Sequence, residues 1–554
     1  MKKIANKIVL PVVAALALSG CLKETFPTNG ATAEQVGQSS SALEAMVNSI
    51  PTSMILYGMN YAQAWDCGYP GIMISLTSMT GDMIIGGYDG YDWFPYWGCN
   101  ISLSYEYVTG YQFWFNYYSW IKTCNDVISS LSETAEEDLS ADQRAYLAVA
   151  LTNRANYYFD LVRLFEPKAP TSDKVHGYTV PDAIKGLACT IVTENTTEAE
   201  AANNPRATVA QVYDEVIFPD LERAERLFDG YRRPTKTMPD KAVVYGMMAR
   251  AYLERGTAGV AGAYENAAKY ARMAITESGC TPLTQDQWED PTNGFNNAYS
   301  NNAWMWCISQ TSDQVHNLYS FIAHMSTEED WTNYGKSVGR SIVSTLYDQI
   351  ADDDFRKHSW LDPAFFDYYN YKSCRSDAAT FFKSVYAGTQ FTREYASIKF
   401  RPGNGDYLTY SIGNAVDLPL MRVEEMYLIE AEAIGATNLA EGKAKLNAFV
   451  QGFRSPSYNC TAASFDAFQE AVALQARIEF WGEGIPFFYK KRLGLGIHLA
   501  NTNCKYDDYR FEVDGVAPWW NIVIPRRELQ NNPAIPEEMN NPNPSGTVDT
   551  VVED

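Results

Sequence analysis

The stretch DKAVVYGMMARAYLERGTAGVAGAYENAAKYARMAITE, residues 240–277, carries the pattern that decides the fold. Its first half repeats apolar residues at helical spacing, and its second half repeats alanine every three or four residues (Val244, Met248, Ala251 and Tyr252, then Ala267, Ala271 and Ala274). Gly256 and Gly262 punctuate the turn between the halves. Because small residues let two helices approach closely, the stretch predicts a tightly packed helical pair.

This helical pair resembles a tetratricopeptide unit, and further helices extend it on both sides. Capping boxes at Ser140 with Gln143 and at Thr208 with Gln211 open helices over 140–166 and 208–228, with a kink expected at Pro219. Apolar spacing predicts further helices over 419–435 and 440–453, and a buried helix face around 114–121. The fold class is therefore mainly α, an irregular tetratricopeptide-like scaffold of helical pairs.

Long segments without a helical period separate these helices. With tetratricopeptide-like helices at about 109–278 and 418–453, the elaborated loops cover about 51–108, 281–417 and 495–525. Loops of this length in compact proteins are usually functional, and these contain most of the tryptophans. We expect one domain over 36–554 with a large loop-rich ligand-binding face.

Composition excludes several classes of protein. The 554 residues are 46% hydrophobic and include 37 Tyr, 25 Phe and 13 Trp, which excludes intrinsic disorder. The formal net charge of −23 disfavours binding to nucleic acid and to anionic lipid headgroups. Neutral or cationic partners fit this surface better.

The N-terminus has the form of a lipoprotein signal. Three lysines precede an apolar run over 8–18 that is too short to span a bilayer, and Leu18-Ser-Gly-Cys21 resembles the bacterial lipobox. We expect residues 1–20 to be a signal peptide, Cys21 to carry lipid, and residues 21–35 to form a tether. A secreted protein with a chance cysteine is the alternative.

Cysteine and histidine spacing predicts neither a disulfide framework nor a metal site. The ten cysteines contain no CxxC, and the five histidines show no metal-ligand spacing. We expect most cysteines to be buried free thiols, with Cys67 and Cys99 as the best candidates for a single pair. Neither a cofactor nor a metal is expected.

Acidic runs contain the only candidates for catalytic residues. Glu328, Glu329 and Asp330 precede Trp331 and could supply a glycosidase acid/base pair. The Asp run at 352–354 could contribute to a calcium site, although a solvated charge run at a helix end is the simpler interpretation.

Aromatic residues on turns carry a stronger functional signal. A flat ring can stack on the apolar face of a pyranose while neighbouring polar side chains hydrogen-bond its hydroxyls. Packing in a satellite core is the alternative for any single ring. Loops near 86–97 and 301–334 form the predicted ligand wall, with Tyr88, Tyr91, Trp93, Trp97, Trp304, Trp306, Trp331 and Tyr334 as stacking candidates.

The order of motifs along the chain resembles the SusD/RagB family of surface lipoproteins from Bacteroidetes. The early signals are Trp120-Ile-Lys-Thr-Cys-Asn125, the helix Asn153-Arg-Ala-Asn-Tyr-Tyr-Phe, and Arg206-Ala-Thr through Asp220-Leu221. More specific are Asp354-Phe-Arg356, Ile398-Lys399-Phe400, Leu418-Pro-Leu-Met-Arg422 running into Glu425-Met-Tyr-Leu-Ile-Glu-Ala431, and Arg477-Ile-Glu479-Phe-Trp-Gly-Glu483-Gly484. Pro486 departs from the basic residue that usually follows Glu-Gly, which suggests a divergent member.

This resemblance implies a protein without catalytic activity, anchored by lipid at Cys21 on the outer membrane and exposed at the cell surface. Members cap a SusC-like TonB-dependent transporter, trap glycan at this lid and pass it into the barrel. The implied ligand is therefore an oligosaccharide or polysaccharide.

Two other functions stay open at this stage. A RagB-like lid would bind peptides and would depend more on backbone hydrogen bonds than on stacked rings. A secreted glycoside hydrolase would use a pair such as Glu329 and Asp330.

Overall fold

A computed structural model describes residues 37–552, apart from positions 38, 62, 86–91, 93, 99–100, 333–338, 363–371, 378–379 and 381–393. Long helices dominate it: α3 (Ser40–Ser53), α5 (Val108–Leu131), α6 (Ala141–Phe165), α9 (Phe218–Leu227), α10 (Lys241–Thr257), α11 (Ala263–Ser278), α18 (Val423–Gly435), α19 (Leu439–Phe453), α20 (Phe465–Glu479) and α21 (Ile485–Leu493). The prediction of a mainly α fold is confirmed.

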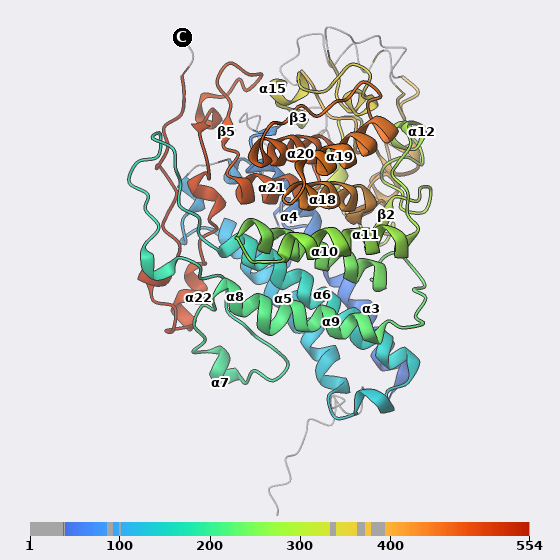
Figure 1. The fold of residues 1–554 in the computed structure, drawn as a ribbon, viewed down its shortest axis with the longest axis vertical. Helices are drawn as coiled ribbons and strands as arrows, with labels where there is room; N and C mark the ends of the chain where they lie inside the picture. Colours follow the sequence, from blue (N-terminus) through green and yellow to red (C-terminus); the bar gives the residue numbers. More distant parts are fainter. Residues whose placement is uncertain are drawn as a thin grey trace, which may run out of the picture.

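The helices form a stack of neighbouring pairs. α5 packs against α6 and α6 against α9, while α10 packs against α11, α11 against α18 and α18 against α19. In Figure 1 these layers rise from α5, α6 and α9 through α10 and α11 to α18–α21. Since α11 and α18 are neighbours, residues 279–422 are an insertion between two successive members of the stack.

Both predicted capping boxes are present. Gln143 N–H donates to Ser140 Oγ at 3.2 Å, and Ser140 N–H donates back to Gln143 Oε1 at 2.9 Å. Thr208 and Gln211 form the same arrangement at the start of α8 (Val209–Val212). A π-helical turn over Tyr213–Ile217 then joins α8 to α9, where Pro219 lacks the N–H that a regular helix would use.

Small residues bring neighbouring helices close together. A Cβ on Gly442 of α19 would lie 2.5 Å from Gly435 Cα of α18, so neither position tolerates a side chain. Gly256 lies within α10 rather than in the turn, where a Cβ would meet the ring of Tyr264 at 2.8 Å. Gly262, with φ +72°, starts α11.

The helix predicted over 419–435 is wrong at its N-terminal end. Residues Asp417–Arg422 form strand β4, which pairs antiparallel with β2 (Trp304–Ser309), and α18 begins only at Val423. Every residue of β4 is buried. A strand buried on both faces has a continuous apolar sequence that periodicity cannot distinguish from a helix.

The segment 51–108, predicted as loop, contains helix α4 (Tyr69–Ser78). All residues from Pro70 to Ser78 are buried, so the sequence shows no amphipathic period. The shorter elements are β1 (Met83–Ile84), α12 (Gln285–Glu289), α13 (Phe321–Met325), β3 (Ser341–Ile342), α15 (Ser344–Tyr347), α17 (Tyr410–Gly413), β5 (Ile497–His498), β6 (Glu512–Val513), α22 (Arg526–Asn531) and α7 (Glu198–Ala201).

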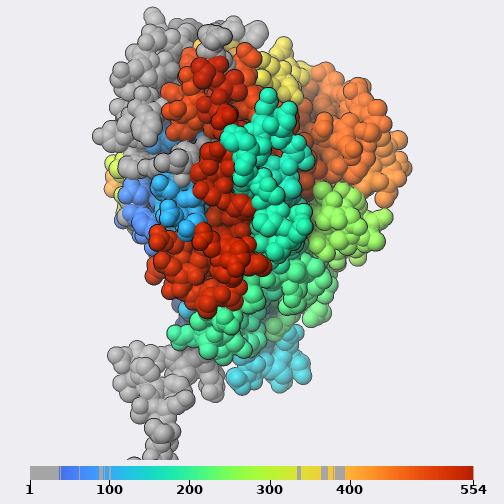
Figure 2. Space-filling view, turned by 90° about the vertical axis from the view of Figure 1, so that its left-hand side faces the viewer, coloured from blue at the N-terminus to red at the C-terminus, as the bar shows by residue number. Residues whose placement is uncertain are grey.

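The C-terminal segment closes over the chain that follows α6. Figure 2 shows red C-terminal residues lying beside the turquoise segment around 170–205. His176 N–H donates to the Thr547 carbonyl at 2.9 Å, and Arg206 donates to the Met539 carbonyl at 2.9 Å and to Asn541 Oδ1 at 3.1 Å. No helix in the described part of the chain is long and apolar enough to cross a membrane.

Eight cysteines lie in the described ranges, and all are free thiols, seven of them buried. Cys67 is among them, so the suggested pairing of Cys67 with Cys99 is not formed. Cys99 and the predicted signal peptide and lipid anchor at Cys21 lie outside the described residues.

Candidate ligand-binding site

The two loops predicted as the ligand wall meet at one short ladder. β1 pairs antiparallel with β3, with Met83 opposite Ile342 and Ile84 opposite Ser341. The first loop leaves β1 and the second returns to β3. The ladder therefore places the bases of both predicted loops side by side, although they are some 250 residues apart in sequence.

An ion pair joins the same two loops above the ladder. Arg340 donates from both terminal nitrogens to Asp92, at 2.6 and 2.7 Å, and both side chains are buried. The His324 ring meets Phe94 edge-on at 5.0 Å between centroids. Burial, together with the Arg340 charge, lowers the pKa of His324 to about 3, so this imidazole is neutral and acts as a packing group.

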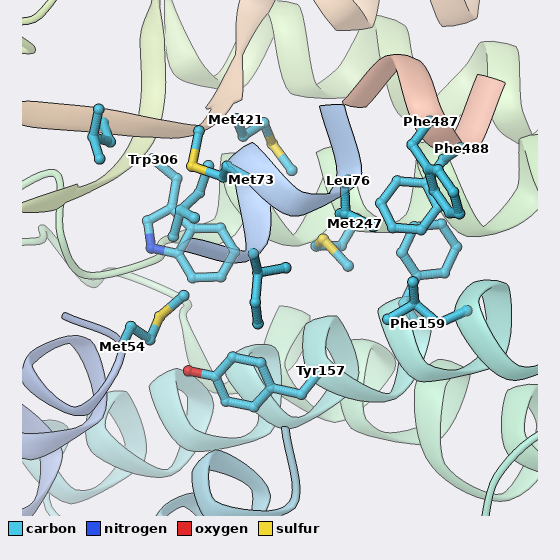
Figure 3. Packing of buried hydrophobic residues seen from close by; sticks show 14 of the residues in the cluster. Met54, Met73, Leu76, Tyr157, Phe159, Met247, Trp306, Met421, Phe487 and Phe488 are labelled. Atoms are coloured by element: carbon cyan, nitrogen blue, oxygen red, sulfur yellow. The ribbon is translucent and has the colours of Figure 1, made fainter. Parts of the chain in front are cut away.

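Three of the predicted stacking rings lie in the core. Trp97 and Trp304 are 0% exposed and Trp306 is 1% exposed. Trp304 and Trp306 lie on β2, where Phe295 packs on Trp304 with centroids 5.5 Å apart, and Figure 3 shows Trp306 among Met54, Met73 and Met421. These rings offer no face to a ligand in this structure, which corrects the prediction for them.

Of the five remaining predicted rings, only Trp331 lies in the described part of the chain. Trp331 is half-buried and lies against α17, where a Cβ on Gly413 would be 2.4 Å from the indole ring. Tyr88, Tyr91, Trp93 and Tyr334 lie outside the described residues.

The acidic residues near Trp331 are bound into the fold. Glu328 accepts hydrogen bonds from Ser373 Oγ at 2.5 Å and from Cys374 N–H at 3.2 Å. Glu329 accepts from Thr332 Oγ1 at 2.7 Å, and Asp330 pairs with Arg375 at 3.4 Å. Glu329 and Asp330, the predicted hydrolase pair, thus each make a contact with a neighbouring side chain of the fold.

The three carboxylates at 352–354 each contact a different partner and do not form a shared calcium site. Asp352 pairs with Lys357 at 2.6 Å, Asp353 accepts from Ser455 Oγ at 2.6 Å, and Asp354 pairs with Arg356 at 2.6 Å. Within the described ranges, no group of three or more His, Cys, Asp or Glu side chains could hold a metal ion.

A partly exposed aromatic surface joins the predicted Trp331 to four residues that sequence reasoning missed. The Tyr57 ring lies on His316 with centroids 3.5 Å apart and near Tyr319 at 5.0 Å. Asn414, next to Gly413, donates to the His316 carbonyl at 3.0 Å, which connects this stack to α17 and Trp331. We call Tyr57, His316, Tyr319, Trp331 and Tyr410 the aromatic surface.

Exposure and charge suit the aromatic surface to a neutral ligand. Tyr57 is 38% exposed and Tyr410 is 42% exposed. Burial lowers the pKa of His316, so the imidazole in the stack is neutral at neutral pH. The sequence signal was weak because these residues are dispersed over three segments.

Comparison with known proteins identifies the fold. Residues 33–253 match a SusD-like family described as starch-binding and associating with the outer membrane. A SusD-like carbohydrate-binding protein from Bacteroides vulgatus aligns with a TM-score of 0.65 at 21% identity, over 90% of this chain and 97% of that one. The chain has the fold of these SusD-like proteins, and its residues 33–253 are similar to the SusD-like family. A SusD superfamily protein from Bacteroides thetaiotaomicron (TM-score 0.65, 18% identity, 91% and 99% coverage) and one from Bacteroides fragilis (0.63, 18%, 90% and 99%) share the fold.

Among curated protein sequences, none matches the chain.

The later SusD-like motifs converge on one buried charge cluster. Its cations are Arg356, Lys399, Arg422 and Arg454, and its anions are Asp354, Glu424, Glu479 and Glu483, all at most 4% exposed. Arg422 donates to Glu483 at 3.0 Å and to Glu479 at 2.9 Å, while Lys399 donates to Glu483 at 2.8 Å. Four cations face four anions, so the cluster is balanced when all are ionised.

The early SusD-like motifs converge in the same way around Arg154. Its guanidinium donates to Asp220 at 2.7 and 2.8 Å and to Asn125 at 2.8 Å, joining α5, α6 and α9. The motifs that carried the resemblance therefore hold the scaffold together.

Proposed function

We propose that this chain is a non-catalytic, lipid-anchored protein of the outer-membrane surface that binds glycan and delivers it to a SusC-like TonB-dependent transporter. The observation that carries the proposal is the match of residues 33–253 to a family described as starch-binding and associating with the outer membrane. The SusD-like neighbour from Bacteroides vulgatus described as carbohydrate-binding supports it.

The aromatic surface supplies the chemistry for glycan capture. Exposed phenol rings and a neutral imidazole present flat apolar faces that stack on pyranose rings, at small cost in side-chain entropy. Trp331 is the one predicted ring that belongs to this surface, and Trp93, Tyr88, Tyr91 and Tyr334 stay predicted contacts. The acidic charge of the chain is compatible with a neutral saccharide.

Calorimetry on the mature protein tests the function. Neutral oligosaccharides and polysaccharides form one panel, and unstructured peptides of mixed composition form the other. We expect heat of binding from at least one saccharide and none from the peptides. Binding confined to peptides would instead support a RagB-like lid, and would contradict the proposal.

The hydrolase alternative is tested on the same saccharides. Incubation with the protein should release no reducing sugar. Turnover that disappears in a Glu329→Gln or Asp330→Asn variant would contradict a purely binding role.

A further inference from the structure

A second group of aromatic rings lies along the outer side of α5. Tyr111 and Phe115 are four residues apart, as neighbours on one face of a helix are, and Tyr107 directly precedes the helix. The rings of Tyr111 and Phe115 stack with centroids 5.3 Å apart. Tyr61, from the chain after α3, meets the Tyr111 ring edge-on at 5.8 Å. We call Tyr61, Tyr107, Tyr111 and Phe115 the α5 stripe.

The rings of the α5 stripe are open to solvent. Tyr61 is 54% exposed and Tyr107 is 42% exposed, while Tyr111 and Phe115 are half-buried. Tyr117, on the inner side of the same helix, is fully buried. In Figure 2 light-blue residues of this part of the chain lie at the surface beside red residues of the C-terminal segment. Exposed apolar groups that gather in this way mark a binding surface, because they add little to the core.

One short loop connects the α5 stripe to the aromatic surface, with Tyr57 at its start and Tyr61 at its end. The buried Asp66 carboxylate holds this loop, since its Oδ2 accepts the N–H groups of Asn60 and Tyr61 at 2.7 and 2.9 Å. Asn60 Nδ2 also donates to Asn116 Oδ1 of α5 at 3.1 Å. The loop is therefore fixed against α5 before a ligand arrives, which lowers the entropic cost of binding.

The dimensions of the two groups of rings suit an extended ligand. Four residues separate Tyr57 from Tyr61, so their Cα atoms lie at most about 14 Å apart. The stripe itself runs over eight residues from Tyr107 to Phe115, which is about 12 Å along a helix. This length exceeds one pyranose ring, so the stripe can contact more than one residue of a sugar chain.

Hydrogen-bonding groups accompany the rings. Arg527 Nη1 of α22 donates to the Tyr111 hydroxyl at 3.0 Å, and its guanidinium carries further N–H donors that can bind sugar hydroxyls. The tyrosine hydroxyls both donate and accept. Residues 45–65, which supply Tyr61, contain no Asp, Glu, Lys or Arg in a chain of net charge −23. Flat rings with hydroxyls and few charges favour a polyhydroxylated, uncharged ligand over a charged peptide.

We propose that the α5 stripe is a second set of subsites for a linear glycan, which passes from the aromatic surface over Tyr61 onto α5. The two groups of rings then hold different residues of one chain, so affinity increases with the length of the chain. This inference rests on the proposed glycan function and names its substrate class, a linear polysaccharide or long oligosaccharide rather than a disaccharide.

Calorimetry with size-separated fragments of a recognised polysaccharide tests the stripe on the full mature protein. The wild type should bind the longest soluble fragment more tightly than the disaccharide. Tyr61→Ala and Tyr111→Ala each remove one ring, and each should weaken binding of the long fragment by about 2- to 13-fold. Binding of the disaccharide should weaken less, so that the advantage of the long fragment shrinks. Tyr270→Ala, at a half-buried ring on α11 that stacks on Tyr252, is the matched control and should bind as the wild type does.

Thermal unfolding separates a lost contact from a lost fold. Because the Tyr61 ring is more than half exposed, Tyr61→Ala should unfold at the temperature of the wild type. If both variants keep the wild-type ratio of long-fragment to disaccharide affinity, the stripe is overturned as a glycan site and is left to a protein partner, while the proposed function stands. If no saccharide of any length binds the wild type, the stripe and the proposed function both fail.

Discussion

Arg454 and Glu479 form a two-point ion pair that is shielded from solvent. Arg454 Nε donates to Glu479 Oε2 at 2.7 Å and Nη2 donates to Oε1 at 2.9 Å, with both side chains fully buried. Glu479 also accepts from Arg356 at 3.0 Å and from Arg422 at 2.9 Å. One carboxylate thus joins segments near 356, 422 and 454 to helix α20.

Replacing this carboxylate should destabilise the fold strongly. Glu479→Gln leaves three buried arginines with one fewer counter-charge, and breaking a buried pair in this way costs about 3–5 kcal/mol. Chemical denaturation should show this loss in the free energy of unfolding. Glu470→Gln, at an exposed position of the same helix, is the control and should change stability by less than about 0.5 kcal/mol. Equal stability of the two variants would contradict a structural role for the cluster.

Acid should unfold the protein through the same carboxylate. Burial opposes ionisation of Glu479, but the charges of Arg454, Arg422 and Arg356 outweigh it and hold its pKa well below 4.5. A lowered pKa contributes stability that is full above the ordinary value of 4.5 and is lost as pH falls below it. The free energy of unfolding, measured against pH, should fall below about 4.5 in the wild type. Glu479→Gln should show a shallower fall, and parallel curves would refute this assignment.

Lys491 predicts a rise of stability with pH in a second, higher window. The residue is 2% exposed, its Nζ donates to the Leu164 carbonyl at 3.0 Å, and burial lowers its pKa to about 7. Between about 7 and the ordinary 10.5 the unfolded chain binds more protons, so this group makes stability rise with pH across that window. Lys491→Met should remove that contribution to the slope and raise the free energy of unfolding at pH 7.

Titration of unfolding free energy against pH checks the Lys491 prediction. Lys174→Met, at an exposed lysine, should leave the curve unchanged. A Lys491→Met protein that is less stable at pH 7, with an unaltered slope, would show that the lysine is stabilising in its charged form.

Much of the scaffold was predictable because amphipathic helices repeat apolar residues at a helical period that can be read from the sequence. α6 and α19 appear within two residues of their predicted ends, and α10 and α11 together begin and end within two residues of the stretch predicted as a helical pair. The sequence did not predict α4 or β4. Both elements are buried on all sides, so neither shows an alternation of apolar and polar residues.

The site was harder to predict than the scaffold. Tryptophan next to turn residues suggested exposure, but Trp304 and Trp306 fall on a strand whose two faces are both covered. The aromatic surface combines residues from distant segments. Their groups meet only through packing that spacing along the chain does not reveal, as Tyr57 and His316 illustrate.

Lipid anchoring at Cys21 predicts a simple fractionation result. No helix in the described part of the chain can cross a membrane, so in cells that lack the transporter Cys21→Ala should move the protein from the membrane fraction to the soluble fraction. Cys460→Ala, at a buried free thiol, is the control and should stay with the membrane. Unchanged membrane retention of Cys21→Ala would refute the lipid assignment.

The aromatic surface should carry much of the affinity for polymeric glycan. Tyr57→Ala removes the ring that lies on His316, and Tyr410→Ala removes an exposed ring on α17. Since an aromatic contact contributes about 0.5–1.5 kcal/mol, each change should weaken binding of a recognised polysaccharide by about 2- to 13-fold in calorimetry. Phe453→Ala, a 36% exposed ring on α19 outside this surface, should bind normally. If all three variants bind as tightly as the wild type, glycan is held elsewhere on the chain.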